Sequence, residues 1–183
     1  MSAVAIIPAK GSSIRIPFKN RREFHDQPMI SYSIRTAIHS RLFDAVYVST
    51  EDTIISVIAA DFGAKIIDRP PELAEINAPD YGTQVVALHA LKSIGRERGY
   101  ACCIYPCAPM MTPEHLTEGL TVIRATKRPY VYAKGWFYWG RVRTFLDRPE
   151  LGDDSLRLEY GGIDIDTEED WLMAEKMFAG LHK

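Results

Sequence analysis

Near its N-terminus the chain carries an apolar, strand-like segment that runs into a loop of small and basic residues: Ala5-Ile6-Ile7-Pro8-Ala9-Lys10-Gly11-Ser12-Ser13-Ile14-Arg15-Ile16-Pro17-Phe18-Lys19-Asn20. Basic side chains recur through this loop, and no acidic residue precedes Glu23. Small residues let backbone N–H groups approach an anion closely, and clustered cations neutralise its charge. We therefore expect a binding loop for a nucleoside triphosphate. The plainer alternative is a surface loop with solvated cations.

The spacing in this loop excludes two common phosphate-binding patterns. A Walker A loop needs G-x-x-x-x-G-K-[ST], and a dinucleotide-binding turn needs G-x-G-x-x-G. Neither pattern is present in this segment.

Strand-like and helix-like segments alternate along the chain. Apolar runs predict strands at 4–8, 45–49, 65–67 and 101–105. Helical periodicity predicts helices at 29–40, 53–61, 82–94 and 113–126. This alternation is typical of an α/β fold, a mostly parallel sheet flanked by helices.

Beyond residue 127 the alternation weakens. An aromatic segment spans 131–138, a short helix is predicted at 141–146, and a loop is expected over 147–162. A second loop is expected from the Pro-rich turn at Arg69 to about Tyr81. The last predicted helix, 168–181, follows Thr167, a residue type that caps helix N-termini.

Composition limits the class of protein. With 183 residues, 46% hydrophobic and 25% charged, we expect one globular domain over 1–183. A net charge of −2 argues against nucleic-acid binding through bulk electrostatics. No apolar run approaches the roughly 18 residues of a membrane span, and no secretory leader is visible. We expect a cytoplasmic protein with no membrane partner.

The three cysteines, Cys102, Cys103 and Cys107, lie close together without a C-x-x-C spacing. Neighbouring residues of a strand point to opposite faces, so Cys102 and Cys103 cannot share a metal ion. We expect all three to be small buried hydrophobic residues rather than redox or metal groups.

A second site is predicted by Gly161-Gly162-Ile163-Asp164-Ile165-Asp166-Thr167. In extended backbone Asp164 and Asp166 point the same way. Two carboxylates together with substrate phosphates commonly hold Mg²⁺. The alternative is an acidic run that serves the dipole of the next helix, which accounts for residues 168–170 but does not require the alternation. We expect Mg²⁺ at Asp164 and Asp166.

The N-terminal segment resembles the pattern I-P-A-R-G-G-S-K-R-I-P-x-K-N of the sugar-activating cytidylyltransferases, which include the CMP-sialic acid, CMP-pseudaminic acid and CMP-KDO synthetases. The matches are Ile7, Pro8, Ala9, Gly11, Ser13, Arg15, Ile16, Pro17, Lys19 and Asn20. The segment D-I-D-T-x-E-D-W is similar to the family's C-terminal motif, in which two aspartates hold the metal.

The resemblance implies a Rossmann-like nucleotidyltransferase domain and a set of site residues. Lys10, Lys19 and Asp166 would be catalytic, with Lys10, Arg15 and Lys19 on the triphosphate. The substrate contacts would include Ala9, Gly11, Ser13, Arg15 and Asn20.

Three further segments resemble family motifs. Val48-Ser49-Thr50-Glu51-Asp52 resembles V-S-T-D, although it is also an ordinary helix start. Arg69-Pro70 with Glu72-Leu73-Ala74 resembles R-P-x-x-L-A, which implies that Arg69 meets a phosphate or the nucleoside. Gly82 and Thr83 would lie near the cytosine and ribose.

Two segments are similar to the pseudaminic acid branch. Cys103–Pro109 resembles C-I-Y-A-T-A-P, so that Tyr105 stands where the sialic acid branch has a glutamine facing the sugar. Phe137-Tyr138-Trp139-Gly140 resembles Q-F-Y-W-G, which places Tyr138 among the substrate-binding candidates. The alternative for these aromatic residues is core packing, which we expect for at least two of the three.

The implied reaction is attack of the anomeric hydroxyl of a nine-carbon acidic sugar on the α-phosphate of CTP, with release of pyrophosphate, by a homodimer. Sialic or legionaminic acid and KDO are alternative acceptors. The alternative from a different functional class is a relative that binds a nucleotide but has lost catalysis.

The chain departs from the family pattern in several places. Lys10 replaces an arginine, Ile14 replaces a lysine and Trp136 replaces a glutamine. The region 128–162 is shorter by some tens of residues, and it is there that the family draws its dimer arm and part of its sugar pocket. Either the acceptor site is pared down, or the sequence omits segments that the family contains.

Overall fold

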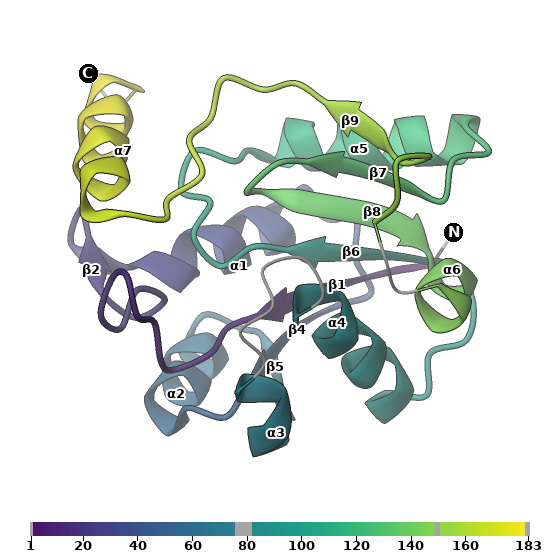
Figure 1. Ribbon diagram of the computed structural model, residues 1–183, viewed down its shortest axis with the longest axis horizontal. Helices are drawn as coiled ribbons and strands as arrows, with labels where there is room; N and C mark the ends of the chain where they lie inside the picture. Colours follow the sequence, from purple (N-terminus) through teal and green to yellow (C-terminus); the bar gives the residue numbers. More distant parts are fainter. Residues whose placement is uncertain (1, 76–81, 149–150, 182–183) are drawn as a thin grey trace.

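The computed structural model describes residues 2–75, 82–148 and 151–181. Its centre is a seven-stranded sheet in the order β5-β4-β1-β6-β8-β7-β9 (Figure 1). The strands are β1 (Ala3–Pro8), β4 (Ala45–Thr50), β5 (Lys65–Asp68), β6 (Tyr100–Ile104), β7 (Tyr130–Ala133), β8 (Phe137–Arg141) and β9 (Leu156–Leu158). The β1, β4, β5 and β6 strands pair in parallel, whereas β8 runs antiparallel to both β6 and β7. The prediction of an α/β fold with a mostly parallel sheet is confirmed.

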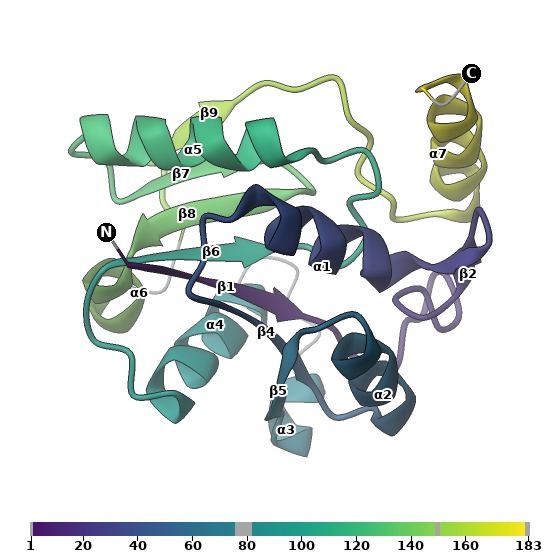
Figure 2. The ribbon, with the colours of Figure 1, turned by 180° about the vertical axis from the view of Figure 1, so that it is seen from behind.

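Helices cover both faces of this sheet (Figures 1 and 2). One face carries α1 (Met29–Ser40), α2 (Thr53–Asp61) and α5 (Pro113–Ala125), and the other carries α4 (Gly82–Ser93) and α6 (Val142–Asp147). Each predicted helix, and each of the four predicted strands, agrees with the structure to within one residue at either end.

The strand residues alternate between two hydrophobic clusters, one on each face. In β1, Ala5 and Ile7 belong to one cluster and Ile6 to the other. In β6, Cys102 and Cys103 divide in the same way, because successive strand residues point to opposite faces. All three cysteines are buried, as predicted, and they are free thiols.

The loop expectations for 147–162 and for 69–81 are wrong in part. β9 pairs in parallel with β7 inside the first of these segments. Its three residues are too few to give a recognisable alternation, and its pairing is set by a strand distant in the sequence. Residues 71–74 form a short helix, α3 (Pro71–Ala74), with Pro71 in its first turn. Residues 76–81 lie outside the described part of the chain.

The C-terminal helix, α7 (Glu168–Leu181), lies at one end of the molecule beside β2 (Glu23–Phe24), which pairs with β3 (Gln27–Pro28) (Figures 1 and 2). The Phe24 ring packs edge to face against Trp171 and Phe178, with centroid separations of 5.4 Å in both pairs. The Asp170 N–H donates to Thr167 Oγ1 (3.2 Å), and Asp170 Oδ2 accepts from the Thr167 N–H (2.8 Å). This reciprocal cap confirms the predicted helix start and fixes the segment that precedes it.

None of the helices in the described part of the chain combines the length and apolar character needed to cross a bilayer.

Candidate active site

A cavity of about 900 Å³ lies where the loops after β1 and β6 meet the β7–β8 hairpin, the start of α4 and residues 164–166. The carboxyl ends of parallel strands converge at this edge, the usual place for a ligand in an open α/β sheet. Most of the residues that the sequence analysis assigned to the site line this one cavity: Lys10, Ser13, Arg15, Lys19, Asn20, Arg69, Gly82, Thr83, Tyr105, Tyr138, Asp164 and Asp166.

Two candidates, Ala9 and Gly11, are not among the residues that line the cavity. Ala9 is fully buried, and its N–H donates to the Ser49 carbonyl at 2.9 Å, which extends the pairing of β1 with β4. The Gly11 N–H donates to Glu51 Oε1 at 2.7 Å.

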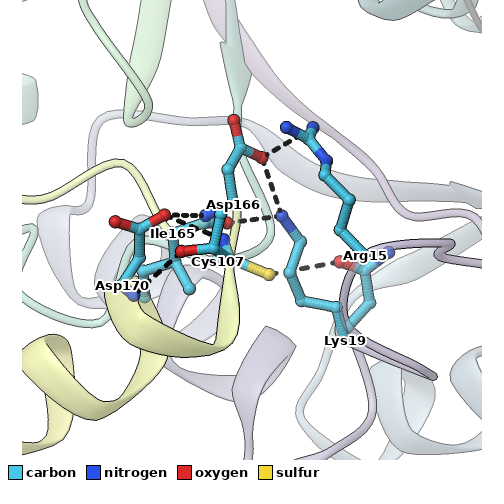
Figure 3. A network of polar contacts seen from close by, with 8 residues as sticks. Arg15, Lys19, Cys107, Ile165, Asp166 and Asp170 are labelled. Atoms are coloured by element: carbon cyan, nitrogen blue, oxygen red, sulfur yellow. Dashed lines mark hydrogen bonds and ion pairs between the residues drawn. The ribbon is translucent and has the colours of Figure 1, made fainter.

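The basic N-terminal loop and the segment that precedes α7 meet at Asp166. Lys19 Nζ donates to the Ile165 carbonyl oxygen at 2.6 Å and lies 3.4 Å from Asp166 Oδ1. Arg15 Nη2 donates to the same Asp166 oxygen at 3.0 Å (Figure 3). The Asp166 N–H in turn donates to Asp170 Oδ2 at 3.0 Å, so the first turn of α7 holds this carboxylate beside the basic loop.

Asp164 lies beside Asp166 on the cavity wall. Burial of the Asp164 carboxyl raises its pKa above its usual value, and the negative charge of Asp166 raises it further, against the opposing effects of Lys134 and Lys19. Gly135 permits this placement, since a Cβ there would lie 2.8 Å from Asp164 Cγ and its φ is +72°. Ile165 between the two aspartates is buried in the core. The two aspartates therefore line the same cavity, although residues 162–166 form no strand.

The aspartate pair has the right chemistry for a hard cation but is not a complete protein site. Among the described residues, no group of three or more His, Cys, Asp or Glu side chains is arranged to hold a metal ion. A cation at Asp164 and Asp166 would need its remaining ligands from substrate phosphates and water.

Arg69 is a buried cation at the cavity wall, 6% exposed. Its Nη2 donates to the Ser49 carbonyl at 2.6 Å, and its Nη1 lies 3.7 Å from Glu51 Oε2. Burial lowers the pKa of the guanidinium, and the Glu51 carboxylate opposes that shift. The Arg69 Nε has no hydrogen-bond partner within the described part of the chain. A buried donor in this state is costly unless a ligand or water accepts from it.

The aromatic run of β8 serves both the core and the cavity. Phe137, Tyr138 and Trp139 are all fully buried, so the expectation of core packing is confirmed. Phe137 and Trp139 belong to one hydrophobic cluster, and Tyr138 belongs to the other. Phe137 and Tyr138 also line the cavity.

Sequence reasoning missed several cavity residues, among them Cys107, Tyr132 and Lys134. Lys134 is at the turn between β7 and β8, and only the Lys134-Gly135 pair between two aromatic runs could have indicated that turn. Cys107 donates from Sγ to Asn20 Oδ1 at 3.3 Å, a contact between residues 87 positions apart that no local pattern signals.

Sequence comparison with known proteins identifies the family of this chain. A family model described as "Cytidylyltransferase" matches residues 4–136. Pseudaminic acid cytidylyltransferase from Campylobacter jejuni (serotype O:2) is 32% identical over 146 residues, which are 79% of this chain and 63% of that protein. N-acylneuraminate cytidylyltransferase A from Danio rerio is 34% identical over 126 residues, 69% of this chain and 28% of that protein. The chain thus spans less than two thirds of the length of these relatives.

Solved structures share the fold. A structure of CMP:2-keto-3-deoxy-manno-octonic acid synthetase complexed with CTP superposes with a TM-score of 0.80 at 14% identity, covering 99% of this chain and 100% of that one. The family match runs from β1 through the basic loop, Arg69 and the start of α4 to the hairpin turn, and so includes most of the cavity wall. The chain belongs to the cytidylyltransferase family, as the pattern of its N-terminal loop predicted.

Proposed function

We propose that the protein is a CMP-sugar synthetase, which transfers the CMP group of CTP to a nine-carbon acidic sugar and releases pyrophosphate. The observation that carries this proposal is the meeting of the basic N-terminal loop with the Asp164–Asp166 pair in one cavity of about 900 Å³. Cations and carboxylates at one place suit a triphosphate and the charges that develop during its cleavage.

The nucleotide would occupy the side of the cavity formed by the loop after β1 and the start of α4. Lys10, Arg15 and Lys19 would neutralise the triphosphate, because all three belong to one loop and line the cavity. Arg69 would meet the nucleoside or a phosphate, and its unsatisfied Nε supports this role. Gly82 and Thr83 would lie against the cytosine and ribose.

Mg²⁺ is the metal that we propose for the aspartate pair. The donors that line this part of the cavity are carboxylate oxygens, which suit a small hard cation that keeps several waters. Bound to Asp164 and Asp166, it would supply positive charge to the phosphate oxygens. Arg15 and Lys19 already lie beside Asp166, so the protein's own cations would act at the same phosphates.

The acceptor would bind on the side formed by the hairpin and the segment after β6. Tyr105 and Tyr138 lie there, with ring centroids 6.4 Å apart, and the exposed Lys134 gives this wall a positive charge. An acidic sugar fits such a wall. Pseudaminic acid is our first candidate, because relatives with that name match 79% of this chain at 32% and 31% identity, whereas the N-acylneuraminate relative from Danio rerio matches 69% of it at 34% identity. Sialic or legionaminic acid and KDO are the alternatives.

One observation favours a second function. Ile14 lines the cavity with 84% of its surface exposed, where the family pattern has a lysine. An apolar group at an anion site weakens it, as expected of a relative that binds nucleotide without catalysis.

Pyrophosphate release separates these functions. We expect release from CTP with Mg²⁺ and pseudaminic acid, and slower release with sialic, legionaminic and KDO acceptors. The measurement is a coupled pyrophosphate assay over the four sugars, with a no-sugar control. CTP binding without release for any acceptor would favour the non-catalytic relative.

Asp166→Asn tests the metal site against the helix cap. It keeps the side-chain shape and an acceptor for Arg15 and Lys19 but removes the charge, so turnover should fall by at least about 100-fold, since each 1.36 kcal/mol of lost transition-state stabilisation is tenfold. The free energy of unfolding should change by less than about 1 kcal/mol, because these ion pairs are partly exposed.

Glu169→Gln is the matched control, because Glu169 is an exposed acidic residue in the first turn of α7. It should cost only about 0.3–1 kcal/mol of stability through the helix dipole and leave turnover unchanged. Turnover is measured against Mg²⁺ concentration for both variants. Normal activity and Mg²⁺ dependence in Asp166→Asn would reduce the aspartate pair to part of a solvated helix start.

We also propose a homodimer, on the family resemblance alone. The β7 and β8 strands are joined by residues 134–136, which leaves no room for a long arm within this described hairpin. Sedimentation equilibrium at micromolar concentration should give twice the chain mass. A strict monomer would instead mean that the interface was lost together with the arm.

A further inference from the structure

One peptide unit of the basic loop is held from both sides by side chains of other segments. The Lys10 carbonyl oxygen accepts from Asn20 Nδ2 at 2.8 Å. The N–H of the same peptide unit, that of Gly11, donates to Glu51 Oε1 at 2.7 Å. A peptide plane is rigid but can rotate about the soft dihedral angles on either side. With both its polar groups bonded, this plane has one favoured orientation.

The two side chains that hold the plane are themselves fixed. Asn20 is 7% exposed, and its Oδ1 accepts from the thiol of Cys107, which is 5% exposed. Burial raises the pKa of Cys107 to about 12, so the thiol keeps its proton and donates. This bond leaves the amide group of Asn20 turned toward the Lys10 carbonyl.

On the other side Glu51 is an exposed residue, and an ion pair with Arg69 restrains its carboxylate. Its second carboxylate oxygen lies 3.7 Å from Nη1 of Arg69, which is buried and tied to the Ser49 carbonyl. The neighbouring Asp52 caps α2 and packs so closely against the loop that a Cβ on Gly11 would collide with the Asp52 carboxylate. The loop is therefore docked on the end of β4 and the start of α2.

The orientation of this plane decides what the loop presents to the cavity. Lys10 and Ser12 line the cavity, whereas Gly11 between them does not, and neither does Glu51. A rotated plane would swing the chain that carries Lys10 and Ser12. Misplacing a group that holds the reacting phosphates by about 1 Å can cost on the order of 100-fold in rate.

We propose that Glu51 and Cys107 are positioning residues of the nucleotide site, which act through the Gly11 N–H and through Asn20 to fix the Lys10–Gly11 peptide plane. This inference rests on the proposed function for its kinetic consequence, but not for its structural one. Both residues lie in segments that resemble family motifs, but the sequence analysis named neither of them as a site residue.

Paired substitutions at each position separate positioning from charge and from packing. Glu51→Gln keeps an oxygen that accepts from the Gly11 N–H but removes the charge beside Arg69, and Glu51→Ala removes both. Cys107→Ser keeps a donor for Asn20, and Cys107→Ala does not. Cys102→Ala is the control for a buried thiol lost from the core, because Cys102 lies in the same segment and does not line the cavity.

We expect Glu51→Gln and Cys107→Ser to retain kcat/KM for CTP within about 3-fold of the wild type. The two alanine variants should lose about 10–100-fold, with the loss in kcat as well as KM, because the loop then reaches the reacting phosphates in several orientations. Cys102→Ala should lose stability but keep kcat/KM. Equal losses in Glu51→Gln and Glu51→Ala would overturn the proposal in favour of a charge effect on Arg69. Equal losses in Cys107→Ala and Cys102→Ala would reduce Cys107 to packing.

Amide hydrogen exchange of Gly11 gives a readout that needs no turnover. The Gly11 N–H should be protected in the wild type and in Glu51→Gln, and should exchange at least about tenfold faster in Glu51→Ala. If the wild type releases no pyrophosphate with any sugar, the proposed function fails. The exchange pattern still tests whether Glu51 fixes the Lys10–Gly11 peptide plane. If Glu51→Ala does not fold, the comparison of Glu51→Gln with the wild type decides. An unprotected Gly11 N–H in the wild type would overturn the proposal.

Discussion

The contact on which the site depends joins Lys19 to the segment before α7, where its ammonium group donates to the Ile165 carbonyl at 2.6 Å and lies 3.4 Å from Asp166. It connects segments 146 residues apart in the sequence, both of which line the cavity. The cap at Thr167 and Asp170 and the aromatic packing of Trp171 and Phe24 serve this contact, because they hold the end of the chain against the N-terminal loop. The C-terminal helix is thus part of the site's support, although it lies at one end of the molecule.

With this arrangement the proposed nucleotidyl transfer would need no nucleophilic side chain. Phosphoryl and nucleotidyl transfer depend mostly on positioning and charge stabilisation, which fixed cations and a metal-binding carboxylate pair would supply. Burial and, to a smaller extent, the charge of Asp166 raise the pKa of Asp164 and so disfavour its ionised form, and nearby cations oppose this shift. Arg15 and Lys19 already neutralise part of the charge of Asp166. We propose that Mg²⁺ neutralises the rest of the charge of the aspartate pair.

The fold could be predicted closely because its central strands are continuous apolar runs and its helices carry helical apolar periodicity, as β1 and α1 illustrate. The two sides of the site could be predicted for a similar reason, since the basic loop and the Asp164–Asp166 alternation are short, contiguous patterns. What could not be predicted depends on contacts between distant segments. β9 exists because of its pairing with β7, and the roles of Glu51 and Cys107 depend on hydrogen bonds to a loop tens of residues earlier. Ala9 illustrates a limit of motif matching. It matches the family motif and was predicted to contact substrate, but it is buried in the core and does not line the cavity.

The central claim is that the cations of the N-terminal loop form a CTP site, and calorimetric titration tests it most directly. CTP, ATP, GTP and UTP are titrated into the wild type and into Lys19→Ala. The account predicts that CTP binds most tightly and that Lys19→Ala weakens its binding by about 1.5–3 kcal/mol, the usual value of a hydrogen bond to a charged group. Equal affinities for the four nucleotides, together with an unchanged affinity in Lys19→Ala, would contradict it.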